Sequence, residues 1–162
     1  MLSYHTCPLA TLGGKDTGGM NVYVRELSRQ LGRRGLAVDI FTRRQDPAAP
    51  VVEHPWEGVR VLQLAAGPQA PMDRRRLFIH LPEFVQGLRE VAASEGTVYD
   101  VIHSHYWLSG WAALQLRDQW AAPVVHMFHT LGVLKSASPA GPQAPEARER
   151  SRVETDIICE AD

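Results

Sequence analysis

A glycine-rich turn that runs directly into a helix is the first part of this sequence that could do chemistry. The stretch Gly13–Leu31 reads GGKDTGGMNVYVRELSRQL. Gly18 and Gly19 have no side chains, so a ligand can approach their backbone closely, and the free N–H groups at a helix start favour an anion. Asp16 or Thr17 could cap that helix. The pattern therefore predicts a phosphate-binding turn, although glycines that only form a tight turn would give the same pattern.

Two further polar turns follow apolar, strand-like runs. The first is His103–Trp107, reading HSHYW, and the second begins with His129 and Thr130. Tyr106 could meet a polar ligand, and His129 could donate to a sugar hydroxyl or to a developing negative charge. The plain alternative for His129 is a structural histidine that holds the turn. The two histidines of HSHYW, at i and i+2, could share a face, but no third ligand is evident, so we expect no metal site.

Basic residues lie close to these turns in the sequence. Lys135 follows the His129 turn, and Arg148, Arg150 and Arg152 come after a connection rich in proline and glycine. A guanidinium suits a phosphate, and a lysine would add a point charge. Helical spacing separates Arg150 from its two neighbours by about 200° each way, so the three arginines cannot all face one site. A solvated helix face is the alternative interpretation.

Covalent catalysis has little support in the sequence. There is no convincing Ser-His-Asp order, no carboxylate pair and no setting that would activate Cys7. Cys7 and Cys159 lie far apart and form no CxxC motif, which argues against a disulfide framework or a zinc site. The glycine turn is also neither a P-loop nor a GxGxxG fingerprint.

Composition indicates an ordinary globular domain. The chain has 162 residues, is 44% hydrophobic and carries a formal net charge of −1. A near-neutral chain of this length can bury a core, and it gives no reason to expect a nucleic-acid partner. No signal-peptide pattern and no apolar run long enough to span a membrane is evident, so we expect a cytoplasmic protein.

Strand-like and helix-like segments alternate along the chain. Such alternation predicts an α/β, Rossmann-like, three-layer domain with a mostly parallel sheet, in which all strand-to-helix turns meet at one edge. Pro82 predicts a break between a short helical turn and a longer helix. The expected strands are Met1–Thr6, Leu36–Thr42, Val59–Leu64, Val101–Ser104 and Val124–Phe128, and the expected helices are Gly19–Arg34, a broken one over Arg74–Ser94, Trp107–Gln119 and Glu146–Glu160.

Several motifs together resemble the N-terminal domain of family 4 glycosyltransferases. They include HTCPL at His5–Leu9, DTGGMNVYV at Asp16–Val24, VDIFTR at Val38–Arg43, the segment Ile102–Gly110 and the HTL run at 129–131. This family contains retaining, metal-independent enzymes of the two-domain GT-B type. The likeness covers essentially the whole chain and is greatest to members that act on inositol phosphate and to sucrose-phosphate synthases.

The resemblance implies a role for each matching residue. Gly19 would lie near the donor diphosphate, and His129 would take the position of the histidine that contacts the transferred sugar, the catalytic position. Arg74 replaces the lysine of the family pattern, which keeps the charge but changes its geometry. The implied substrate-binding residues are His5, Asp16, Thr17, Gly18, Gly19, Met20, Asn21, Arg74, Tyr106, Thr130, Lys135 and Arg150.

The implied activity is transfer of a sugar from a nucleotide-sugar donor, such as a UDP-sugar, to a phosphorylated acceptor with retention. No metal or other cofactor is implied. The family's second domain, which holds most of the nucleotide, is absent from residues 1–162. We therefore expect this half to bind the acceptor without turnover, and we expect that it could self-associate.

Two alternative functions stay open at this point: a non-catalytic phosphosugar-binding module, and a nucleotide or flavin binder that shares only the fold.

Overall fold

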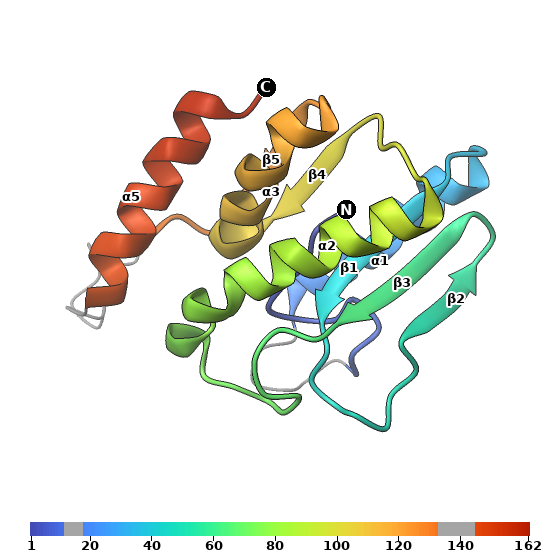
Figure 1. Cartoon of the computed structure of the whole chain (residues 1–162), viewed down its shortest axis with the longest axis horizontal. Coiled ribbons are helices and arrows are strands. Elements are labelled where there is room, and N and C mark those ends of the chain that lie inside the picture. Colours follow the sequence, from blue (N-terminus) through green and yellow to red (C-terminus); the bar gives the residue numbers. More distant parts are fainter. Residues whose placement is uncertain (12–17, 133–144) are drawn as a thin grey trace.

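The computed structural model describes residues 1–11, 18–132 and 145–162, and it shows one sheet with helices on both faces (Figure 1). Most of the predicted elements are present, with ends displaced by one or two residues. The elements are α1 (Gly19–Arg33), β1 (Val38–Arg43), β2 (Val52–Trp56), β3 (Val59–Leu64), the 3-10 turns η1 (Arg74–Arg76) and η2 (Phe78–His80), α2 (Leu81–Glu95), β4 (Ile102–His105), α3 (Tyr106–Trp120), β5 (Val124–Met127) and α5 (Pro145–Glu160).

The N-terminal segment lies in the middle of the sheet, although it is too short to form a regular strand. Leu2 makes parallel bridges to Phe41 of β1 on one side and to Ser104 of β4 on the other. The pairs β1–β3 and β4–β5 are also parallel. The resulting order is β2, β3, β1, the N-terminal segment, β4 and β5. The chain adds β1 and β3 on one side of the N-terminal segment and then β4 and β5 on the other side. The order of the strands therefore reverses beside the N-terminal segment, and ligands of open α/β sheets bind at such a point.

Strand β2 was not predicted, because it lies in the Pro/Gly-rich connection that precedes β3. It pairs antiparallel with β3 at the sheet edge, with an irregular register between Glu53 and Trp56. Pro55 lies in this strand, and an edge strand tolerates a residue without an N–H donor. The sheet is therefore mostly parallel, as predicted, with one antiparallel edge.

Two apolar clusters hold the layers together. The larger one joins α2, α3 and α5 to one face of the sheet, and the smaller one packs Val24 of α1 against Val38, Ile40, Val59 and Val61 on the other. The sequence predicts a buried helix face made of Met20, Tyr23, Leu27 and Leu31, which recur at helical spacing, and this prediction was wrong in detail. The buried residues of α1 are Asn21, Val24, Ser28 and Gly32, whereas Tyr23 is 38% exposed.

Local signals at the helix ends agree with the structure. Pro82 lies in the first turn of α2, after the two 3-10 turns, so the predicted break is confirmed. Gly35, beyond the end of α1, has φ = +83°, a conformation that glycine adopts without strain. Gly32, within α1, is required for close packing, because a Cβ at this position would lie 2.3 Å from the Glu57 carbonyl oxygen.

Among the helices that the structure describes, none is long and apolar enough to cross a membrane.

Candidate functional site

The three polar turns predicted from the sequence meet at the carboxyl edge of the sheet. The rings of His5 and Tyr106, which follow adjacent central strands, lie 4.5 Å apart between centroids. Asn21 of the glycine turn donates a hydrogen bond to Thr6 over 2.8 Å. His129 is 3.1 Å from His105, measured between Nε2 and Nδ1. The structure thus brings together segments that are more than 100 residues apart in the chain.

Asn21 fixes the glycine turn to the sheet. Its amide nitrogen donates to Thr6 Oγ1 at 2.8 Å and to the Cys7 carbonyl at 2.7 Å, and its amide oxygen accepts from the Gly18 N–H at 3.3 Å. The side chain is 1% exposed, and both hydrogens of its amide are engaged within the protein. Asn21 therefore positions the start of α1, rather than offering its amide donors to a substrate.

The two glycines at the start of α1 leave space above the sheet edge. Gly18 and Gly19 are exposed, and a Cβ added to either would meet nothing within 4 Å in the part of the chain that the structure describes. Met20 behaves differently, because its half-buried side chain packs against both apolar clusters. Asp16 and Thr17, which were predicted to bind substrate, lie outside the described residues.

His5 sits at the base of the site as a neutral imidazole. Its side chain is buried, and its Nδ1 has no hydrogen-bond partner among the described residues. Burial, reinforced by the positive charges of Arg74 and Arg150, lowers the pKa of His5 to about 3. Arg74 lies on η1 and is close enough to act electrostatically on this ring.

Arg150 joins two hydroxyl groups from different turns. Its Nη1 donates to the Tyr106 hydroxyl at 3.2 Å, and its Nη2 donates to both Thr130 Oγ1 at 3.2 Å and the Thr130 carbonyl. The guanidinium carbon also lies 4.9 Å from the centre of the Tyr106 ring. Arg150 is 6% exposed, whereas Arg148 and Arg152 point to solvent, as the helical spacing predicted.

Glu154 orients this arginine. Its carboxylate accepts from Arg150 Nε at 2.6 Å and from the Gly132 N–H at 2.9 and 3.0 Å. Both side chains of this ion pair are less than 10% exposed. The pair thus links α5 to the turn that carries Thr130. Sequence reasoning missed Glu154, although its i,i+4 spacing from Arg150 was a usable signal.

His129 lies in a cluster of aromatic rings. The Tyr23 ring meets the rings of His129 and His105 edge-on, with centroid distances of 5.4 and 5.8 Å. Burial lowers the pKa of His129 and lowers that of His105 to about 2. Both rings are therefore neutral near pH 7. The predicted contact of His129 with a transferred sugar stays a prediction, and Tyr23 and His105 are neighbours that the sequence did not reveal as such.

Backbone strain also concentrates here. Among the described residues other than glycine, Tyr106, Ala121 and His129 have positive φ, at 72°, 47° and 58°. Ala121 ends α3, whereas the other two belong to the site. Strained residues of this kind cluster at functional sites, where surrounding contacts hold them in place.

Metal binding has no geometric support in the described ranges. No group of three or more His, Cys, Asp or Glu side chains there could hold a metal ion. His103 and His105 do lie close, with ring centroids 4.3 Å apart.

Lys135 lies outside the described residues, so its predicted contact with a phosphate stays a prediction.

Comparison with known proteins identifies the class. Residues 18–162 match the glycosyl transferase 4-like domain family, and the chain belongs to this family. It is similar to the N-terminal part of the D-inositol 3-phosphate glycosyltransferases of Kribbella flavida and of Mycolicibacterium smegmatis. The chain is 47% identical to each of them along its whole length, and it covers 38% of each relative.

A solved structure agrees with this assignment. Sucrose-phosphate synthase from Thermosynechococcus elongatus superposes with a TM-score of 0.92 at 40% identity, over 99% of this chain and 40% of that one. The predicted fold, one Rossmann-like half of a GT-B glycosyltransferase, is therefore confirmed. The chain spans less than half the length of the relatives it matches.

We predict that removing the charge of Glu154 destabilises the domain. In Glu154→Gln, the buried Arg150 loses its countercharge, and loss of one partner of a buried pair costs about 3 kcal/mol. Urea unfolding followed by circular dichroism measures the change. The matched control is Glu149→Gln, an exposed carboxylate on the same helix, for which we expect a change within about 0.5 kcal/mol. Equal losses in the two variants would contradict the assigned role of Glu154.

We also predict that acid unfolding depends on His5. Because its folded pKa lies near 3, below the ordinary value of 6.5, the unfolded chain binds more protons between these two pH values. Stability therefore falls as the pH drops from 6.5 towards 3, with His5 contributing a slope of up to about 1.4 kcal/mol per pH unit. His5→Gln should flatten the measured slope. Gln substitution of the exposed His54 should leave the slope unchanged.

Proposed function

We propose that this chain forms the acceptor-binding half of a retaining glycosyltransferase. The whole enzyme would move a sugar from a nucleotide-sugar donor, of the UDP-sugar kind, to a hydroxyl of a phosphorylated acceptor. Support comes from family membership and from relatives whose names specify D-inositol 3-phosphate or sucrose phosphate. We infer that the acceptor is an inositol phosphate or a sugar phosphate.

The observation that carries this proposal is the pair of hydroxyl groups held by Arg150. A hydroxyl has one O–H donor and can accept through its oxygen. Both Tyr106 and Thr130 accept from the same guanidinium, and among the described residues neither hydroxyl donates a hydrogen bond, so each O–H can donate to a ligand. Two oriented donors beside a buried cation suit the oxygens of a phosphate. Arg74 adds positive charge nearby, because Arg74 and Arg150 both act electrostatically on His5.

The remaining turns fit a donor substrate. The exposed glycines at the start of α1 leave room for a diphosphate to approach the first helical N–H groups. His129 is neutral near pH 7 and so could donate a hydrogen bond without forming an ion pair. These residues would orient a donor sugar toward the acceptor held by Tyr106, Thr130 and Arg150.

In the proposed reaction, the acceptor hydroxyl oxygen bonds to the anomeric carbon as the bond from that carbon to the diphosphate breaks. Attack occurs on the face from which the diphosphate leaves, which preserves the configuration. The hydroxyl proton passes to the departing diphosphate, so no strong protein base is needed. Positioning of the two substrates and electrostatic support of the leaving group would supply most of the acceleration.

We expect the isolated chain to bind phosphorylated acceptors through the two hydroxyls. Titration calorimetry with inositol 3-phosphate and with fructose 6-phosphate should show weak binding that unphosphorylated inositol lacks. Tyr106→Phe and Thr130→Val should each weaken binding about 5- to 10-fold, because each removes one hydrogen bond to a charged group. The control Thr155→Val removes an exposed hydroxyl on α5 and should leave affinity unchanged. Unchanged affinity in both site variants would refute the acceptor site.

We expect no turnover by the chain alone, since it spans about 38% of its relatives. Incubation with UDP-N-acetylglucosamine or UDP-glucose and the acceptors above, followed by mass spectrometry, should yield no glycosylated product. Addition of the separately expressed C-terminal part of a relative should restore product formation. Clear turnover by the pure chain would contradict the proposal that this domain supplies only half of the active site.

A further inference from the structure

Two imidazole rings share a hydrogen bond at the carboxyl edge, and its direction decides what His129 offers a ligand. His105 Nδ1 lies 3.1 Å from His129 Nε2. Both rings are neutral near pH 7, because burial lowers the pKa of each. A neutral imidazole has one N–H donor and one bare acceptor nitrogen, so one ring donates and the other accepts. The direction of this bond therefore fixes the tautomer of both rings.

Two arrangements satisfy this bond. In the first, His105 donates from Nδ1, and His129 accepts at Nε2 and carries its own proton on Nδ1. In the second, His129 donates from Nε2, and its Nδ1 is a bare acceptor. The first arrangement makes His129 a donor toward a ligand, whereas the second makes it an acceptor or a base.

The far side of the His105 ring distinguishes the two arrangements. His105 is fully buried, and its Nε2 has no hydrogen-bond partner among the described residues. The first arrangement leaves a bare nitrogen at this position, whereas the second leaves an N–H group. Among backbone groups, buried N–H donors without a partner are rarer than under-satisfied acceptors, and the same order applies to a ring that cannot reach water. The structure therefore favours the first arrangement.

The His105 ring is held in place by its surroundings. Its backbone N–H donates to the Leu2 carbonyl at 3.0 Å, which ties the end of β4 to the N-terminal segment. The rings of His103 and Tyr23 lie 4.3 and 5.8 Å from the His105 ring, between centroids. A fully buried ring with two ring neighbours cannot turn without displacing them. The donor at Nδ1 therefore keeps a fixed direction toward His129.

His129 presents its other nitrogen on the side of the ring away from His105. Its side chain is half-buried, and its Nδ1 bonds to no residue in the described ranges. The turn that carries it is held by a hydrogen bond from the Thr130 N–H to the Phe128 carbonyl at 2.6 Å, across His129 with its φ of 58°. His129 Nδ1 is therefore available to a ligand beside Thr130.

We propose that His105 is a positioning residue, whose Nδ1–H donates to His129 Nε2 and so holds the His129 proton on Nδ1, where it donates to a hydroxyl of the transferred sugar. The tautomer rests on the geometry alone, and the sugar contact rests on the proposed function. A ring in this state has no lone pair free on the ligand side. His129 therefore acts as a hydrogen-bond donor and not as a base, which agrees with a reaction that needs no strong protein base.

The tautomers can be measured directly in the unmodified chain. In isotopically labelled histidine, protonated and bare ring nitrogens give well-separated signals, and long-range proton–nitrogen spectra near neutral pH assign each ring. We expect the proton of both His105 and His129 on Nδ1. The exposed His54 is the internal control and should show mainly the Nε2–H form that free histidine prefers in water. A His129 ring protonated on Nε2 would overturn the inference.

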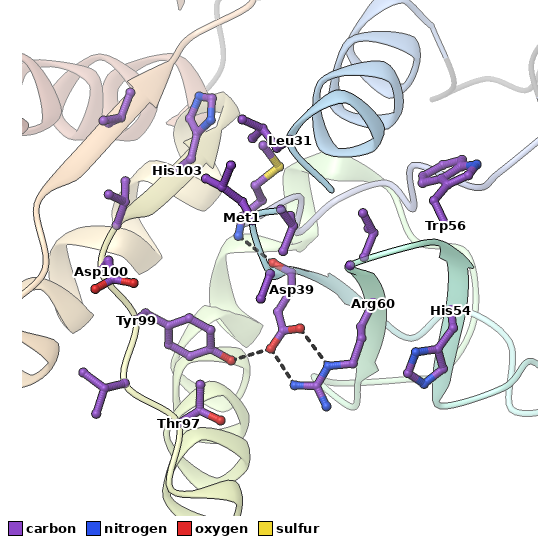
Figure 2. A pocket seen from close by; sticks show the side chains of 18 residues that line it. Met1, Leu31, Asp39, His54, Trp56, Arg60, Thr97, Tyr99, Asp100 and His103 are labelled. Carbon is purple, nitrogen blue, oxygen red and sulfur yellow. Dashed lines mark hydrogen bonds and ion pairs between the residues drawn. The ribbon is translucent and has the colours of Figure 1, made fainter. Parts of the chain in front are cut away.

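A groove at the opposite end of the sheet supplies a matched control residue. The groove has a volume of about 710 Å³ and lies between β1 and β4 at the amino ends of the strands. Its mostly apolar lining includes Met1, Leu31 and His103 (Figure 2). The His103 ring contacts His105, but in the described part of the chain it makes no hydrogen bond to His129.

Substitution of these two histidines separates positioning from packing. His105→Phe keeps an aromatic ring in the buried space and removes the Nδ1 donor, so the His129 proton should move mainly to Nε2. His103→Phe makes the same change two residues earlier on β4 and should leave the His129 tautomer unchanged. An unchanged tautomer in folded His105→Phe, or the same change in both variants, would overturn the positioning role. If His105→Phe does not fold, the spectra of the unmodified chain decide alone.

Activity measurements separate this inference from the proposed function. With the C-terminal part of a relative added, His105→Phe should lower kcat about 2- to 10-fold, the effect of one misdirected hydrogen bond, and should leave the KM for the acceptor unchanged. An unchanged kcat in the folded variant would refute the sugar contact. Absence of turnover in every version would refute the proposed function and the sugar contact with it, whereas the tautomer, measured without substrate, would stand.

Discussion

Burial of the short N-terminal segment is the constraint on which the rest of the structure depends. Leu2 joins the two halves of the sheet through its bridges to β1 and β4, and no other segment in the described ranges pairs with both. Tyr4 locks the segment in place, because its ring packs 4.7 Å from Phe84, its hydroxyl donates to the Leu77 carbonyl and its N–H donates to Ser109. His5, at the carboxyl end of this segment, is consequently held beneath the site with little freedom to move.

The site combines neutral histidines with one buried, paired arginine. Burial keeps the imidazoles of His5, His105 and His129 uncharged near neutral pH, so they add no repulsion to the guanidinium of Arg150. The cost of burying that guanidinium is offset by Glu154 and by three oxygen acceptors from Tyr106 and Thr130. The result is a rigid set of donors, which suits a reaction that depends on positioning more than on proton transfer by the protein.

The two edges of the sheet have different physical characters. The carboxyl edge carries the glycine turn, the histidines and the arginines, and it corresponds to the ligand-binding edge of open α/β sheets. The amino edge carries the apolar groove between β1 and β4, where polar side chains such as Asp39 and Arg60 are paired with each other. Central strands therefore connect a polar end of the sheet with an apolar groove at the opposite end.

The sequence by itself determined the alternation of strands and helices, the mostly parallel character of the sheet, the three polar turns, and the fact that Arg150 cannot share a helix face with Arg148 and Arg152. These features are local, since they follow from periodicity, turn residues and helical spacing. Only the tertiary structure decided that the Asn21 amide donates to Thr6 and to the Cys7 carbonyl, and that Glu154 orients Arg150. It also decided that the rings of Tyr23 and His129 are in contact and that β2 forms an edge strand. Each depends on which atoms of distant segments meet after folding, and one-dimensional spacing does not encode those distances.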